Sequence, residues 1–217
     1  MTEGKKAARA AGKVSLAVMT SRILGLVRDQ FFAGLFGAGL YNDAWLVALR
    51  IPNMLRDLFA EGALSAAFVP TFTKYLKNEG RQEAFYLANL VAGSLLILLG
   101  LLTICLFFFS DFFVTLLAAG FSGVEGKVEI TSTLLKIVSP FLLLLALASA
   151  AAGMLNTLDH FFIPALAPAI YNVSLILAGI FLVPRFEAEG IVTIYAMGWG
   201  AVRSEERRVG KECRSRW

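Results

Sequence analysis

The chain has 217 residues, of which 58% are hydrophobic, and a formal net charge of +4. Soluble domains are about 45–50% apolar, and the excess here falls into runs of about 20 residues, which predicts a multi-pass membrane protein rather than a soluble one. Residues 203–217 hold six basic and three acidic side chains, so the rest carries 14 basic against 13 acidic, and nothing indicates nucleic-acid binding.

Six hydrophobic segments follow one another along the chain. Their ranges are 14–36, 43–69, 84–109, 131–155, 161–183 and 190–202. The first five are long enough to span a bilayer as helices, whereas the sixth offers only about twelve apolar residues. Because a lipid-spanning segment must satisfy its backbone hydrogen bonds internally, we predict an all-α fold, a polytopic transmembrane helical bundle.

The basic residues outside these segments predict the orientation. Residues 1–13 carry four of them and the loop after the second segment carries three. The two loops on the opposite side carry one each. By the positive-inside rule, residues 1–13 form a cytoplasmic N-terminus and residues 14–202 form the transmembrane bundle.

Residues 203–217 interrupt the sixth segment with charged side chains. One interpretation is a polybasic segment lying against anionic lipid. The interpretation we adopt is a non-native tail, because these residues resemble a translated sequencing-adapter read-through. The sixth helix is then truncated, and no function is assigned to the tail.

Four arginines lie within the first two segments: Arg22, Arg28, Arg50 and Arg56. An arginine at the centre of a lone helix in lipid costs about 2.5 to 3.5 kcal/mol. Its guanidinium stays charged and offers a planar fork that matches phosphate oxygens. We therefore expect these helices to face a polar, water-accessible cavity that handles an anion such as a diphosphate.

Helical spacing gives the first segment a polar face. Arg22, Gly25 and Asp29 share one side, and Arg28 lies about 120° from Arg22. Arg22 and Asp29 are too far apart in sequence for a direct contact, so we expect their partners on other helices. Gly25 allows another backbone or a ligand to come close.

The second segment carries a longer polar stripe. Arg50, Asn53 and Asp57 lie on one face, and Pro52 predicts a kink beside them. A structural alternative exists for the whole set, because four acidic residues in these segments could balance the four arginines as ion pairs. We expect Asp57 and Glu61 to be mostly of this structural kind.

We expect no enzymatic activity, no cofactor and no metal. The single histidine, His160, lies in a short loop, and Cys105 and Cys213 form no metal-binding or disulfide pattern. The sequence has no nucleophile–base pair and no glycine-rich phosphate loop.

Several short motifs together carry a family resemblance. They are TSRILGLVRD at 20–29, FGAG at 36–39 followed by Asp43, RIPNMLR at 50–56, FAEGA at 59–63, AFVP at 67–70, LNT at 155–157, PALAP at 164–168 and Asn172. This set resembles the MurJ/MviN family of lipid II flippases over roughly residues 14–200. The first two segments are the most specific part.

The resemblance implies fourteen transmembrane helices in two lobes around a V-shaped cavity. This chain supplies about six N-terminal helices, most of the first lobe. The implied substrate-binding residues, which hold the diphosphate or line the cavity, are Ser21, Arg22, Arg28, Asn53 and Arg56. The implied gating or polar cavity residues are Asp29, Asp43, Arg50 and Glu61.

The implied function is the transfer of lipid II, an undecaprenyl-diphosphate-linked peptidoglycan precursor, from the inner to the outer leaflet of the bacterial plasma (inner) membrane by alternating access. Expected partners are lipid II, membrane lipids and cell-wall synthesis proteins, and the fragment is expected to be inactive alone. Two alternatives remain open: an exporter of another lipid-linked glycan, and a non-transporting scaffold for cell-wall assembly.

Overall fold

The computed structural model describes residues 3–57, 65–158 and 161–214. Within these ranges every regular element is a helix and no strand occurs, so the predicted all-α class is confirmed. The elements are α1 (Glu3–Phe36), α2 (Leu40–Arg56), α3 (Ser65–Asn78), α4 (Arg81–Phe108), α5 (Ser110–Leu117), the 3₁₀ helix η2 (Ala119–Gly123), α6 (Lys127–Thr157), α7 (Phe162–Phe181), α8 (Val183–Ala188) and α9 (Ile194–Arg214).

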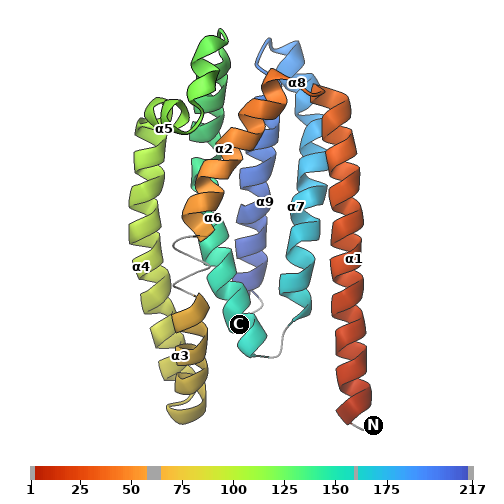
Figure 1. Ribbon diagram of the computed structural model, residues 1–217. Helices are drawn as coiled ribbons and strands as arrows, with labels where there is room; N and C mark the ends of the chain where they lie inside the picture. Colours follow the sequence, from red (N-terminus) through yellow and green to blue (C-terminus); the bar gives the residue numbers. More distant parts are fainter. Residues whose placement is uncertain (1–2, 58–64, 159–160, 215–217) are drawn as a thin grey trace.

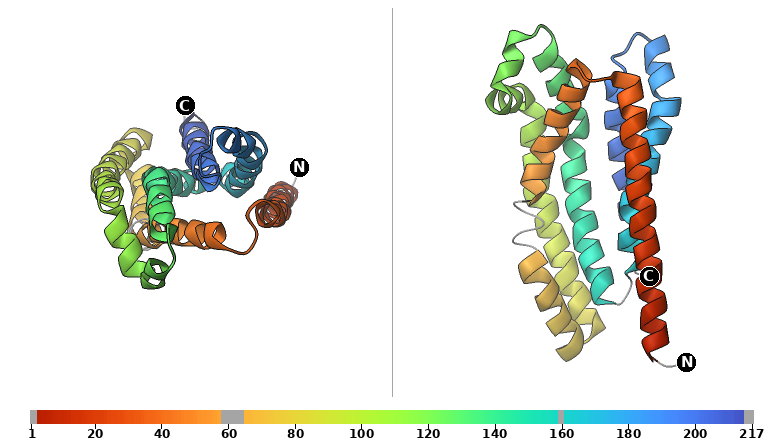
Figure 2. Two further views of the ribbon diagram at one scale, coloured as in Figure 1. Left: turned by 90° about the horizontal axis from the view of Figure 1, so that it is seen from above. Right: turned by 45° about the vertical axis from the view of Figure 1, so that its right-hand side comes forward.

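Helix α6 is the centre of the bundle. Helices α2, α4 and α9 pack against it, and α7 packs between α9 and α1 (Figure 1). Viewed from above, α1 stands at one side of the molecule, well separated from most of α2 (Figure 2). Its main packing partner is therefore α7, and it meets α2 only near the turn that joins them.

The largest apolar cluster lies between α2, α6 and α9. It includes Ile51, Leu134, Leu142 and Met197, all nearly or fully buried. Helix α6 is buried along much of its length, which fits an apolar segment surrounded by other helices on several sides. This core fixes α2, and with it one wall of the site described below.

Three helical segments of the described ranges are long and apolar enough to cross a membrane: Arg81–Phe108, Lys127–Thr157 and Pro164–Ala188. Helices α1 and α2 are not among them, although the sequence predicted five spanning segments. The reason lies in their side chains and length, because α1 carries Arg22, Arg28 and Asp29, and α2 has 17 residues. The two helices that carry the predicted anion site are thus less lipid-like than α4, α6 and α7.

The other predicted segments map onto the structure with shifted ends. The segment 43–69 corresponds to α2 and the start of α3, and 190–202 lies largely within α9. The short elements α5, η2 and α8 were not predicted. Helix α9 continues past residue 202, so the predicted boundary with the tail is not a break in the helix, and the non-native origin of residues 203–217 stays a prediction.

Close packing between α7 and α9 depends on a glycine. A Cβ built at Gly200 would overlap the Cβ of Ala178, so the two backbones approach closer than side chains allow. We predict that Gly200→Ala destabilises the bundle by about 1–3 kcal/mol, because the helices must separate. Thermal unfolding in detergent measures the effect. The matched control is Gly100→Ala in α4, where nothing lies within 4 Å of the added Cβ, and equal effects at both positions would contradict the prediction.

Candidate functional site

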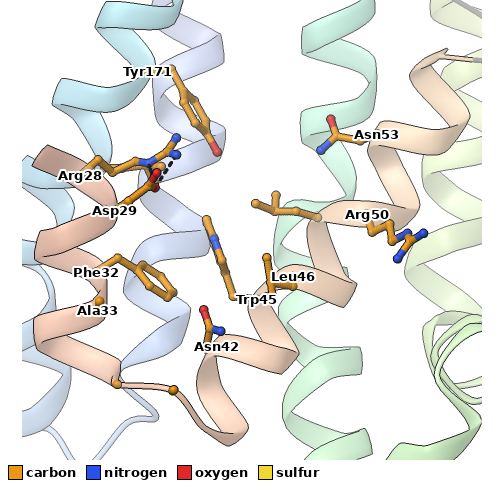
Figure 3. A pocket seen from close by; sticks show the side chains of 14 residues that line it. Arg28, Asp29, Phe32, Ala33, Asn42, Trp45, Leu46, Arg50, Asn53 and Tyr171 are labelled. Atoms are coloured by element: carbon orange, nitrogen blue, oxygen red, sulfur yellow. Dashed lines mark hydrogen bonds and ion pairs between the residues drawn. The ribbon is translucent and has the colours of Figure 1, made fainter. Parts of the chain in front are cut away.

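A cavity of about 730 Å³ lies between α1, α2 and α7 (Figure 3). This volume is within the range of small-molecule sites. Its lining residues are Arg28, Asp29, Phe32 and Ala33 of α1, Gly37 and Ala38 of the turn, Asn42, Trp45, Leu46, Leu49, Arg50 and Asn53 of α2, and Tyr171 and Leu175 of α7. Positions three and four apart recur on α1 and α2, so each helix presents one face to the cavity.

The cavity has an apolar wall between two polar ends. Phe32 and Trp45 approach each other across it with ring centroids 5.6 Å apart. Figure 3 shows Arg28 and Tyr171 on one side of this aromatic pair and Arg50 on the opposite helix. An elongated ligand with a charged group and an apolar or ring-shaped group matches this arrangement.

The guanidinium of Arg28 is the most fully partnered polar group of the site. Its Nε and Nη2 donate to Oδ1 of Asp29 at 3.0 and 2.6 Å, and its Nη1 donates to Oδ1 of Asn172 at 2.9 Å. The ring centroid of Tyr171 lies 5.8 Å from its Cζ, within cation–π range. A guanidinium has five N–H donors, so two remain without a partner among the described residues and can meet an anion.

Asp29 pairs with Arg28, its neighbour on the same helix. The expectation that the partner of Asp29 lies on another helix is therefore wrong. Adjacent helical residues do not normally face each other, but the long arginine side chain folds back onto the carboxylate. The Asp29 side chain is 64% exposed, which leaves this ion pair open to competition from another anion.

Asn172 joins α7 to α1. It is 5% exposed, and its Nδ2 donates to the backbone oxygen of Ser21 at 3.0 Å. A Cβ added at Gly25 would lie 3.5 Å from that Nδ2, so the close neighbour expected at Gly25 is the Asn172 side chain. Ser21 itself is buried at this contact rather than facing the cavity.

The structure brings some of the predicted site residues together and separates others. Those in the cavity lining are Arg28, Asp29, Arg50 and Asn53. Arg22 is exposed on the same face of α1 as Asp29, about 10 Å nearer the N-terminus, and lies outside the lining. Arg56 is the last residue of α2, and its side chain is outside the described part. Glu61 falls in 58–64, also outside the described residues.

Asp43 forms an ion pair with Lys127, the first residue of α6. The Lys127 Nζ lies 2.6 Å from Oδ2 of Asp43 and 4.2 Å from the ring centroid of Phe121. The lysine side chain is only 12% exposed. The pair fixes the first turn of α2, next to Asn42 of the cavity lining, against the central helix.

Sequence reasoning missed four contributors to the site. Asn42 and Trp45 continue the helical stripe through Arg50 and Asn53, so the spacing alone could have identified them. Tyr171 directly precedes Asn172, and the family motifs include Asn172 but not Tyr171. Lys127 could not be identified from the sequence, because a pair 84 positions apart leaves no signal in one sequence.

We predict a measurable coupling between Asp43 and Lys127. A double-mutant cycle with Asp43→Asn and Lys127→Ala is expected to give about 0.5–1.5 kcal/mol, a modest value because the carboxylate is half exposed and polar contacts in membrane proteins are weak. Unfolding in mixed micelles measures it. The control cycle replaces Lys127→Ala with Lys136→Ala in the same helix and is expected to show no coupling. Equal coupling in both cycles would refute the pair.

Comparisons with known proteins identify the family of the chain. The sequence model of the family described as lipid II flippase MurJ matches residues 32–202. The lipid II flippase MurJ of Burkholderia cenocepacia is 34% identical over 194 residues, which cover 89% of this chain and 37% of that protein. The lipid II flippase MurJ of Thermosipho africanus is 39% identical over 172 residues, or 79% of this chain and 35% of that one.

A solved structure supports the same grouping. It is described as lipid II flippase MurJ in an inward closed conformation, and it matches with a TM-score of 0.72 at 29% identity over 92% of this chain and 41% of that chain. The chain thus spans little more than a third of the length of the curated relatives it matches.

Proposed function

Because this chain belongs to the MurJ family of lipid II flippases, we propose that it supplies one wall of a flippase cavity that carries a diphosphate-linked peptidoglycan precursor across the plasma (inner) membrane by alternating access. The observation that carries the proposal is the Arg28 guanidinium on the wall of an open cavity, with two N–H donors unused by the described residues. A diphosphate offers the oxygens that such donors bind.

The ion pair with Asp29 suits a transport site. In the empty cavity the carboxylate compensates the arginine, which reduces the cost of a charge in an apolar bundle. A diphosphate brings two negative charges and several acceptor oxygens, so it competes with one half-exposed carboxylate. Binding then exchanges one partner for another, and release restores the first.

Arg50 offers a second cation on the opposite helix. It lines the cavity from α2, with Asn53 one turn away, and its guanidinium points away from Arg28 (Figure 3). A headgroup held from both helices requires this side chain to turn toward α1, and would then sense the separation of the two helices. We infer that relative movement of α1 and α2, which meet only near their turn, changes access to the bound anion.

We also propose a cytoplasmic N-terminus, on the basis of the basic residues in 1–13 and in the loop after the second segment. The turn between α1 and α2 lies at the opposite end of the bundle from the N-terminus (Figure 1). In this orientation the cavity lies toward the outer half of the membrane. Outward movement of a negative group follows an inside-negative potential, which is worth about 2.3 kcal/mol per charge per 100 mV.

We predict that Arg28→Ala abolishes transport. Residues 14–202 would replace the matching segment of the Burkholderia cenocepacia flippase, and the chimaera would be assayed for growth rescue in flippase-depleted cells. Loss of the cavity cation is expected to prevent rescue at native expression, whereas Arg81→Ala, which removes a cation outside the cavity lining, is expected to preserve it. The opposite pattern, in which only Arg81→Ala fails to rescue growth, would support a scaffold role and contradict the transport proposal.

We further predict which lipid occupies the cavity. A photo-crosslinking residue at Leu46, which is 58% exposed and lines the cavity, should capture a diphosphate-linked glycolipid in cells. The same residue at Leu90 of α4, 56% exposed and outside the lining, should capture only bulk phospholipid. Mass spectrometry of the adduct identifies the headgroup. A glycan other than the peptidoglycan precursor would favour the related-exporter alternative over a lipid II flippase.

A further inference from the structure

The side-chain amide of Asn172, on α7, forms hydrogen bonds to α1 through both its oxygen and its nitrogen. Its Oδ1 accepts the hydrogen bond from Nη1 of Arg28 at 2.9 Å, and its Nδ2 donates to the Ser21 backbone oxygen at 3.0 Å. The residue is 5% exposed, so water does not compete effectively for either contact. One buried side chain thus binds two points of α1 that lie about two helical turns apart.

The chemistry of this position favours an amide. It must accept from a cation and donate to a carbonyl, and it must not neutralise the arginine. An aspartate of the same size would accept at both ends, face the Ser21 carbonyl without a proton, and add a second negative charge beside Arg28. A leucine of similar volume would make neither contact and would leave buried polar groups unpaired.

The fixed Nη1 also sets the plane of the guanidinium. With Nη1 held by α7, and Nε and Nη2 held by Asp29, the planar group has contacts on two edges. Without Asn172, the hydrogen bonds of Arg28 would all go to its neighbour on the same helix, and only the less directional cation–π contact with Tyr171 would tie it to α7. Helix α1 packs mainly against α7, so few contacts from other helices would restrain the Arg28 and Asp29 side chains.

We propose that Asn172 is a positioning residue for the anion site, which holds the Arg28 guanidinium with its free N–H donors toward the cavity. This role rests on the proposed function, because it takes Arg28 as the group that meets the diphosphate. Asn172 itself lies outside the cavity lining and acts on the ligand only through Arg28.

The test has two readouts on the 217-residue chain in lipid nanodiscs. The first is the ¹⁵N NMR signal of the Arg28 side chain, assigned by its loss in Arg28→Lys and recorded without ligand. A guanidinium held on two edges rotates slowly about its Cζ–Nη bonds and gives separate Nη resonances. The second is the affinity for inorganic pyrophosphate, measured by titration of the same samples.

We expect Asn172→Leu to merge the Nη resonances and weaken pyrophosphate binding about tenfold, the effect of losing one charge-assisted hydrogen bond. Asn172→Asp should weaken binding further, because its carboxylate competes with the ligand for Arg28. Asn172→Gln, which keeps the amide, should retain part of both signals. The matched controls, Asn89→Leu and Asn89→Asp at an exposed position of α4, should change neither readout.

The outcomes separate the two proposals. If Arg28→Gln binds pyrophosphate as tightly as the unsubstituted chain, the anion site itself is wrong. If Arg28→Gln loses binding but Asn172→Leu and Asn172→Asp keep both the separate resonances and the affinity, the site stands and the positioning role is overturned. If size-exclusion chromatography shows that Asn172→Leu does not fold, Asn172→Asp and Asn172→Gln decide whether Asn172 positions Arg28. The NMR signal recorded without ligand tests this role even where pyrophosphate binds weakly.

Discussion

The compensated charge of Arg28 is the constraint on which the site depends. A guanidinium within an apolar bundle is tolerated only where carboxylate, amide and aromatic partners surround it, and Arg28 has one of each in Asp29, Asn172 and Tyr171. These partners still leave donors open to the cavity. The same contacts therefore reduce the free-energy cost of burying the charge and leave the guanidinium available to an anion.

Packing explains why this site lies at the edge of the bundle rather than in its core. Helix α6 and its neighbours form the apolar centre, which holds α2 in place, and the Asp43–Lys127 pair adds a polar contact at the end of α2. Helix α1 packs mainly against α7 and contributes Phe32 to the same apolar cluster. The cavity therefore lies between two helices that are held by different partners, α2 by α6 and α1 by α7.

Much of the fold and the charged part of the site could be predicted from the sequence. Long apolar runs specify the main helices, and helical spacing places Arg50 and Asn53 on one face. The partners could not be predicted, because Arg28 meets Asn172 and Asp43 meets Lys127 only through tertiary packing across 144 and 84 positions. Likewise, α5 and α8 begin where long apolar runs bend, which composition does not reveal.

We propose that the cavity selects a diphosphate through Arg28. Native mass spectrometry of the chain with equal amounts of undecaprenyl diphosphate and undecaprenol tests it most directly, because the two lipids share their tail and differ only in the charged group. We expect a clear preference for the diphosphate that disappears in Arg28→Gln. Equal binding of both lipids by the unsubstituted chain, or an unchanged preference in Arg28→Gln, would contradict it.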